Sequence, residues 1–313
     1  MKCKFCGQNH PDNYMFCPTT GKEIQRKKAC SNPKCQDYGK LILPFDSKFC
    51  VTCGHPISID ENKTLSDKLL FKIGNVDFNM IRIRKGSFMM GETNNHEELS
   101  GAELPEHKVI LTKYYYIGET LVTQALWKEV MGDNPSCCGE GGYGPFTNEW
   151  ESLPVDSVSW EDCQIFTNKL NNLLRHQLNK MKFRLPTEAE WEFAARGGIY
   201  SKGYQYAGSD NPNIVAWSYE NADGENQPVA RLKSNELGLY DMSGNIYEWC
   251  QDWYDKYSSE TKKDPKGPKF GDWHVYRGGS CGSVVECSSV AYRSNLDSCF
   301  MAESRIGLRI ALS

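Results

Sequence analysis

Runs of alternating apolar and polar residues follow residue 70 and predict several short β-strands. Residues 79–84 and 107–112 show the period of two that a strand with one buried face requires. Three other segments have the helical period instead. The predicted helices cover residues 123–131, a segment that begins at Ser159 and carries Ile165, Phe166, Leu170, Leu173 and Leu174 on one side, and the sequence TEAEWEFAARGG, which begins at Thr187.

Helix-capping residues support the last two helices. The Ser159 hydroxyl can cap a helix together with Asp162, and Thr187 and Glu190 form a capping box. A pair of glycines at 197 and 198 is expected to end the third helix. Residues 198–279 are rich in Asn, Asp, Gly and Trp and lack a long period, so the pattern predicts a loop-rich α+β domain.

Cysteines divide the chain differently, because seven of the 14 lie within the first 53 residues. Two close pairs, separated by 14 residues, have the spacing of a zinc ribbon, in which four thiolates surround a tetrahedral ion. Disulfides are the alternative, but they require an oxidising compartment. The predicted zinc ligands are Cys30, Cys35, Cys50 and Cys53.

An earlier cysteine set is less complete. Cys3, Cys6 and Cys17 begin a second ribbon, but Thr20 stands at the fourth ligand position and a hydroxyl binds zinc poorly. Either His10 completes this site or the unit holds no metal. The sequence therefore predicts a degenerate ribbon over 1–27, a zinc ribbon over 28–57, a linker over 58–73 and a large domain over 74–313.

Charge and hydropathy exclude two classes of protein. The mean hydropathy is −0.59 and no apolar run approaches the roughly 18 residues that a membrane helix needs, so we expect no membrane contact. Residues 1–57 carry a net charge of +5, but the whole chain carries −4, which excludes a basic protein that coats nucleic acid. Because the first residues lack the apolar core of a signal peptide, we expect a cytoplasmic protein.

Several motifs of the large domain carry a family resemblance. They are GSFMMG from Gly86, PVDSVSW from Pro154, FRLPTEAEWEFAARGG from Phe183, GLYDMSGNIYEW from Gly238, RGGS from Arg277 and IGLR from Ile306. Over about residues 74–313 the chain resembles the formylglycine-generating enzyme (sulfatase-modifying factor) family. The resemblance implies a loop-rich α+β domain related to the C-type lectin fold.

The resemblance also implies where catalysis would occur. Members that make formylglycine bind copper(I) through two cysteines at the third and eighth positions after Gly-Gly-Ser, and soft thiolates suit that ion. Here those positions are Ser283 and Ser288, whereas Cys281 and Cys287 lie at the first and seventh. We therefore do not expect copper. An oxidase acting on a peptide cysteine, with a site at Ser280, Cys281 and Cys287, is the alternative.

Relatives in this family also bind calcium at the segment that begins at Gly238. The resemblance matches Asp241, Glu248 and the carbonyls of Gly244 and Ile246 to those ligands, and hard oxygens on a tight turn suit Ca²⁺. The alternative is that the two carboxylates cap turns or pair with arginines. The six histidines are scattered and form no cluster, so we assign them no role.

The C-terminal segment has an unusual composition. Residues 281–313 contain no Lys, Gln or Trp, one Met and two Glu. None of these five residue types is encoded by a codon that ends in cytosine. Codons that end in cytosine are the ones produced when the two adenines of an AAC codon are randomised. The segment resembles the variable proteins of diversity-generating retroelements, which are diversified between RGGS and IGxR. An ordinary divergent tail is the alternative.

Both interpretations predict a binding surface on a rigid scaffold, because loops carry recognition while packed elements carry the fold. We therefore predict a non-catalytic protein that binds a protein or peptide ligand, with a nucleic-acid adaptor acting through the ribbons as a further alternative. The predicted ligand-binding residues are Cys281, Gly282, Ser283, Val284, Val285, Ser288, Ser289, Val290, Ser294, Leu296, Ser298, Cys299 and Phe300.

Overall fold

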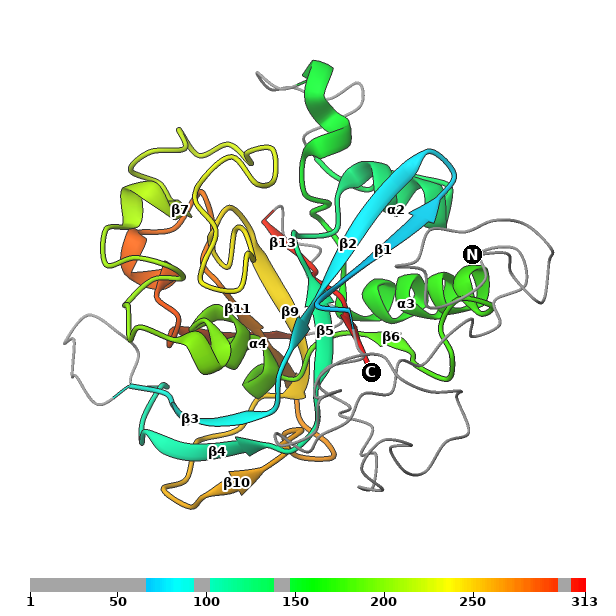
Figure 1. The fold of residues 1–313 in the computed structure, drawn as a ribbon. Coiled ribbons are helices and arrows are strands. Elements are labelled where there is room, and N and C mark those ends of the chain that lie inside the picture. Colours follow the sequence, from blue (N-terminus) through cyan, green and yellow to red (C-terminus); the bar gives the residue numbers. More distant parts are fainter. Residues whose placement is uncertain (1–65, 93–101, 138–146, 298–304) are drawn as a thin grey trace, which may run out of the picture. The chain divides into compact units, whose positions relative to one another are not determined.

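A computed structural model describes residues 66–92, 102–137, 147–297 and 305–313 (Figure 1). The chain divides into two compact units, of which the larger comprises Asp67–Leu173 and Met181–Ser313. The strands of the described residues lie in this larger unit. The predicted ribbon cysteines and His10 lie outside the described residues, so the zinc sites stay predictions.

The largest sheet has five strands. In spatial order they are β1 (Lys68–Ile73), β2 (Val76–Ile83), β5 (Tyr115–Gly118), β14 (Ala311–Leu312) and β6 (Phe183–Arg184), all paired antiparallel. The predicted linker over 58–73 is therefore too long, because β1 belongs to this sheet. Phe71 and Ile73 are buried and alternate with exposed residues, a strand period that the polar residues just before them obscured.

Smaller sheets build the rest of the unit. One contains β10 (Lys262–Lys263), β4 (His107–Leu111) and β3 (Gly86–Met90). The next contains β12 (Arg293–Asp297), β11 (Trp273–Arg277), β9 (Tyr247–Trp253) and β13 (Ile306–Gly307). A two-stranded sheet joins β7 (Ala216–Trp217) to β8 (Ser243–Gly244). Strand β4 confirms the strand predicted over 107–112, and β2 contains most of the strand predicted over 79–84.

Three α-helices form where the sequence predicts them. They are α2 (Gln124–Met131), α3 (Trp160–Leu174) and α4 (Glu188–Ala195). The described residues also form four short 3₁₀ helices: η1 (Thr147–Ser152), η2 (Gly198–Tyr200), η3 (Pro212–Ile214) and η4 (Val285–Ser288). The predicted caps at Ser159 and Thr187 are both present. None of the helices in the described ranges has the length and apolar character needed to cross a membrane.

Two side chains of α3 differ from the prediction. Phe166 and Leu170 are buried, but Ile165 and Leu173 are exposed. The buried stripe starts at Cys163 and continues at Phe166 and Leu170, spacings of three and four residues that define one helix face. Ile165 and Leu173 fall beside that stripe.

The core lies around α4, which packs against β3, β9 and β11 (Figure 1). Trp191 of α4 and Trp249 of β9 are fully buried, as predicted. Trp253, also predicted to be a core residue, is only partly buried and stacks on His274 with 3.7 Å between ring centroids. This core fixes β9 and β11, and the segment with the predicted site begins directly after β11.

Candidate ligand-binding site after strand β11

The loop that joins β11 to β12 spans residues 278–292 and starts on two glycines. Gly278 and Gly279 have φ angles of 101° and 76°, a region that residues with a side chain rarely adopt. A Cβ atom on Gly279 would lie 2.8 Å from Ser288 Cα and 2.9 Å from the Cys287 carbonyl oxygen. The loop therefore folds back against its own start, and Gly279 is required there.

Buried arginines hold both ends of this loop. Arg277 forms an ion pair with Glu192 and donates to the carbonyl of Ala291. Arg293 donates to both carboxylate oxygens of Glu188, at 2.7 and 2.8 Å. Burial opposes ionisation of Glu188, but Arg293 outweighs it and lowers the pKa of this carboxyl below its usual value. The loop ends are thus anchored by charged groups in the core.

The predicted ligand-binding residues fall into three groups. Four are buried and cannot form an exposed surface: Cys281, Ser288, Ser289 and Val290. Five are partly or largely exposed: Gly282, Ser283, Val284, Val285 and Ser294. The structure describes no side chain for the remaining four: Leu296, Ser298, Cys299 and Phe300.

The four buried residues correct the prediction, which treated the whole segment as displayed. A loop of this length must bury some side chains to hold its conformation, and small residues such as Ser288 and Ser289 fill the space beneath η4. The surface that remains centres on Val284, whose side chain is 55% exposed.

Sequence reasoning missed a second segment that adjoins this loop. The Tyr219 N–H donates to the Ser283 carbonyl at 2.9 Å, and the Val285 N–H approaches the Glu220 carboxylate at 3.4 Å. In Figure 1 the orange segment that contains η4 lies beside the segment labelled β7. Tyr219 is 67% exposed. In the sequence, Tyr219 stands out only as an aromatic residue in a polar stretch, and that pattern does not show that it contacts the loop after β11.

We call residues 282–287 together with Tyr219 and Glu220 the loop face. Beneath it, the Ser283 hydroxyl lies 2.8 Å from the Ser280 hydroxyl and 2.9 Å from the phenol of Tyr247. Burial raises the pKa of Tyr247 well above its usual value, so the phenol remains protonated and can donate to Ser283. Ser283 is thus part of a neutral hydrogen-bond chain.

The two cysteines of the alternative oxidase site have different surroundings. Cys281 is buried and its thiol donates to the Asn226 side-chain oxygen at 3.2 Å. Burial raises the pKa of Cys281 to about 11, although the positive charge of Arg305 opposes this shift. Cys287 is partly exposed. Burial and the bond to Asn226 thus give Cys281 the surroundings of a structural thiol.

Glu248, one of the predicted calcium ligands, pairs with an arginine instead, as the alternative interpretation expects. Glu248 is fully buried and accepts from Arg309 at 2.8 and 3.0 Å and from the Trp191 indole N–H at 2.6 Å. Both of its oxygens are engaged in these bonds.

Asp241 has a similar structural role. Its carboxylate accepts from the Ala230 N–H at 2.8 Å, and burial raises its pKa to about 6. Gly244 turns the chain where its Cα lies against the Trp217 backbone, and Ile246 is in the core. Across the part of the chain that the structure describes, no three His, Cys, Asp or Glu residues are grouped as a metal site. The two predicted carboxylates thus make structural bonds, and calcium at this segment stays a prediction.

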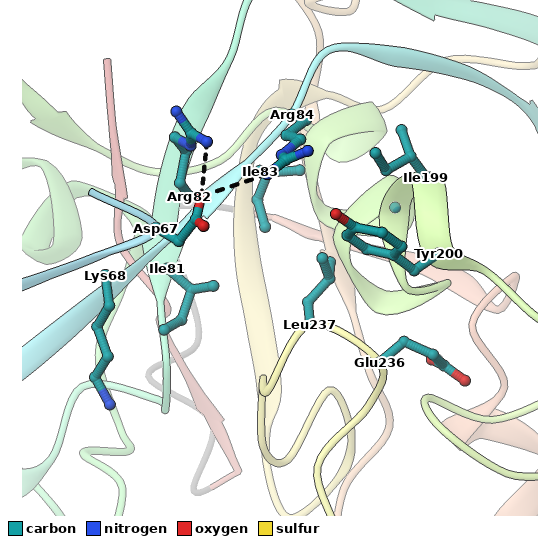
Figure 2. Close-up of a pocket in the computed structure, with 11 residues that line it drawn as sticks. Asp67, Lys68, Ile81, Arg82, Ile83, Arg84, Ile199, Tyr200, Glu236 and Leu237 are labelled. Carbon is teal, nitrogen blue, oxygen red and sulfur yellow. Dashed lines mark hydrogen bonds and ion pairs between the residues drawn. The ribbon is translucent and has the colours of Figure 1, made fainter. Parts of the chain in front are cut away.

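A separate hollow of about 310 Å³ lies between β2, η2 and residues 236–237 (Figure 2). Ile199 and Tyr200 stand at its edge, and Arg82 pairs with Asp67 at 2.6 Å. None of its lining residues belongs to the loop face. It offers a second surface against which binding at the loop face can be compared.

Comparison with known proteins gives three findings. A model of the sulfatase-modifying factor enzyme 1-like domain matches residues 75–313. Chaperone protein LppX of Paenibacillus barcinonensis is 32% identical, with 64% of this chain and 80% of that protein covered. The formylglycine-generating enzyme of Thermomonospora curvata is 35% identical over 44% of this chain and 48% of the enzyme.

Among solved structures, Treponema denticola variable protein 1 is similar over 79% of this chain and 99% of that protein, with a TM-score of 0.68 and 30% identity. These matches confirm the resemblance predicted from the sequence motifs. They also confirm the mixed, loop-rich fold.

Proposed function

We propose that this chain, which belongs to the sulfatase-modifying factor enzyme 1-like family, is a non-catalytic protein that binds a protein or peptide ligand through the loop face. One observation carries the proposal. The positions that hold copper in relatives that make formylglycine are here Ser283, in a neutral hydrogen-bond chain, and Ser288, which is buried. Between them the exposed Val284 offers apolar contact area.

Similarity to Treponema denticola variable protein 1 supports a finer proposal, that the loop is diversified by a retroelement. The buried arginines at both loop ends would let the exposed residues change while the scaffold stays fixed. Sequencing the DNA beside the gene tests this. A near-copy of the codons for residues 281–305 that differs only at adenines, close to a reverse transcriptase, is the expected result, and its absence would contradict diversification.

A matched pair of variants tests binding at the loop face. Phage-displayed random 12-residue peptides are selected on the full chain, and the affinities of the selected peptides are measured by fluorescence anisotropy. Val284→Asp should weaken binding at least about tenfold, as loss of a central apolar contact does. Ile199→Asp, a similar change in the separate hollow, should leave affinity unchanged. The reverse pattern would place binding in the hollow.

Copper titration tests the rival oxidase. We expect the wild-type chain not to bind Cu(I) tightly at one equivalent, because Cys281 and Cys287 are out of the family register and the Cys281 thiol is buried and bonded to Asn226. A Ser283→Cys, Ser288→Cys variant restores the family register and serves as the positive control. Tight equimolar binding by the wild type that disappears in Cys281→Ser, Cys287→Ser would favour the enzyme.

We propose that the N-terminal cysteines bind structural zinc, and this proposal rests on their spacing alone. We also propose that the protein is cytoplasmic. Zinc content of the purified full chain distinguishes the open alternatives. One equivalent is expected if only Cys30, Cys35, Cys50 and Cys53 bind, and two if His10 completes the first ribbon. Loss of one equivalent in Cys50→Ser would assign that ion to the second ribbon.

A further inference from the structure

The loop face carries two carboxylates, Glu220 and Glu286, that have no ion-pair partner in the described part of the chain. The exposed carboxylate of Glu149, by contrast, pairs with Arg231 at 2.7 Å. The Ser218 hydroxyl and the Val285 N–H donate to Glu220 and lower its pKa, so it is ionised at neutral pH.

These two carboxylates come from segments that meet at the start of η4. Glu220 approaches the Val285 N–H, and Glu286 is the next residue along η4. Both also act on Tyr206, whose pKa is raised first by burial and then by the negative charges of Glu286 and Glu220. The loop face therefore has a local negative charge that two separate segments supply.

Arg305 also lies at the loop face, and its single positive charge offsets only part of the charge of the two carboxylates. Arg305 is exposed and donates to the Gly224 carbonyl at 3.2 Å. Its guanidinium lies against Gly282, where an added Cβ atom would be only 1.8 Å from a guanidinium nitrogen. No ion pair joins Arg305 to Glu220 or Glu286 among the described residues.

Apolar and aromatic groups accompany the carboxylates. Tyr219 and Val284 are 67% and 55% exposed, and the bond from the Tyr219 N–H to the Ser283 carbonyl holds their two segments together. A cation near an aromatic face gains from the ring quadrupole, and Lys and Arg stems also pack on apolar surface. Phosphate groups would instead be repelled, which argues against nucleic acid at this face.

We propose that the loop face recognises a segment of a partner protein in which a lysine or arginine stands beside an apolar residue. Glu220 and Glu286 receive the cation, while Tyr219 and Val284 contact the apolar part. This inference rests on the proposed function, because it names the chemistry of the ligand at the same face.

The two acidic residues have different positions relative to the segment that we propose is diversified. Glu286 lies within residues 281–305, but Tyr219 and Glu220 lie outside it. Replacement of the loop would therefore leave Tyr219 and Glu220 in place. Copies of this protein with different loops should share a preference for cationic segments.

Parallel selections test the inference. The random 12-residue peptide library is selected on the full wild-type chain and on Glu220→Gln, Glu286→Gln, a variant that keeps side-chain size and removes charge. Wild-type peptides should be enriched in Lys and Arg about threefold over the starting library, and peptides from the variant should not. For single peptides the variant should weaken binding about fivefold in low salt, a loss that shrinks in 0.5 M NaCl.

Two further variants separate the possible failures. Tyr219→Leu should weaken the binding of cationic peptides more than the binding of uncharged peptides. Equal unfolding midpoints would show that all the variants fold. Peptides that bind the wild type and not Val284→Asp, but show no Lys or Arg enrichment, would overturn this inference and leave the proposed function standing. If Val284→Asp removes no peptide binding, both fail.

Discussion

The core beneath β11 and the loop face above it are stabilised by different means. In the core, Arg277, Arg293 and Arg309 are buried and each pairs with a buried glutamate. The loop face has exposed side chains, and backbone hydrogen bonds fix its path. Exposed side chains of such a loop can therefore be replaced without loss of its path, because the backbone bonds and the buried arginines hold the main chain.

The largest effect is expected in the core. Arg277→Met would remove the buried partner of one Glu192 oxygen, leave only the Arg196 pair at the other, and free the Ala291 carbonyl, so unfolding free energy should fall by about 3–5 kcal/mol. Urea denaturation measures it. Arg231→Met breaks an exposed pair with Glu149 and should cost less than about 1 kcal/mol. Equal losses would remove the distinction between buried and exposed pairs.

A pH effect in the same core is the next largest. The pKa of Asp241 is about 6 in the folded chain and about 3.8 unfolded, so the folded state holds the extra proton between these values. Stability from this group is therefore present below about pH 4 and is lost as pH rises to about 6, by about 3 kcal/mol.

Asp241→Asn removes this titration while keeping an oxygen for the Ala230 N–H. The variant should become more stable relative to the wild type as pH rises from 4 to 6.5, in parallel urea titrations. A difference that stays constant with pH would show that Asp241 titrates normally.

A smaller effect is expected where the core meets the loop. Gly279→Ala forces a Cβ atom against the backbone of residues 287 and 288 at a positive φ, so it should cost about 2–3 kcal/mol. Gly203→Ala has a similar φ of 74° with open space around it, and should cost about 1 kcal/mol. Thermal unfolding of both separates crowding from backbone strain.

The smallest effect is expected in the loop face. Gly282→Ser with Val284→Ser displaces only the exposed end of Arg305 and removes no buried contact, so stability should change by less than about 0.5 kcal/mol. Urea denaturation of this variant beside Arg277→Met gives the contrast directly. A loss above about 2 kcal/mol would mean that the exposed residues also support the fold.

Local sequence patterns predict the helices and their caps well. The capping box of Thr187 and Glu190 and the bonds between Ser159 and Asp162 depend on residues three positions apart, so the sequence contains both partners. Strand β1 was missed because its apolar residues follow a polar stretch.

The site was predicted only in part, because its contacts join distant segments. Ser288 and Ser289 look like surface residues in the sequence, and only the return of the loop onto Gly279 buries them. Tyr219 lies more than sixty residues before its hydrogen-bond partner Ser283. Likewise the pairing of Glu248 with Arg309 spans 61 residues.

The position of β14 at the end of the chain matters for protein synthesis. It is built after the loop, yet it takes a central place in the largest sheet, between β5 and β6, with Ala311 and Leu312 fully buried. A stop codon or a shift of reading frame within the loop codons would remove this strand together with Arg309. Only messages translated in frame through the loop would supply the strand that pairs with both β5 and β6.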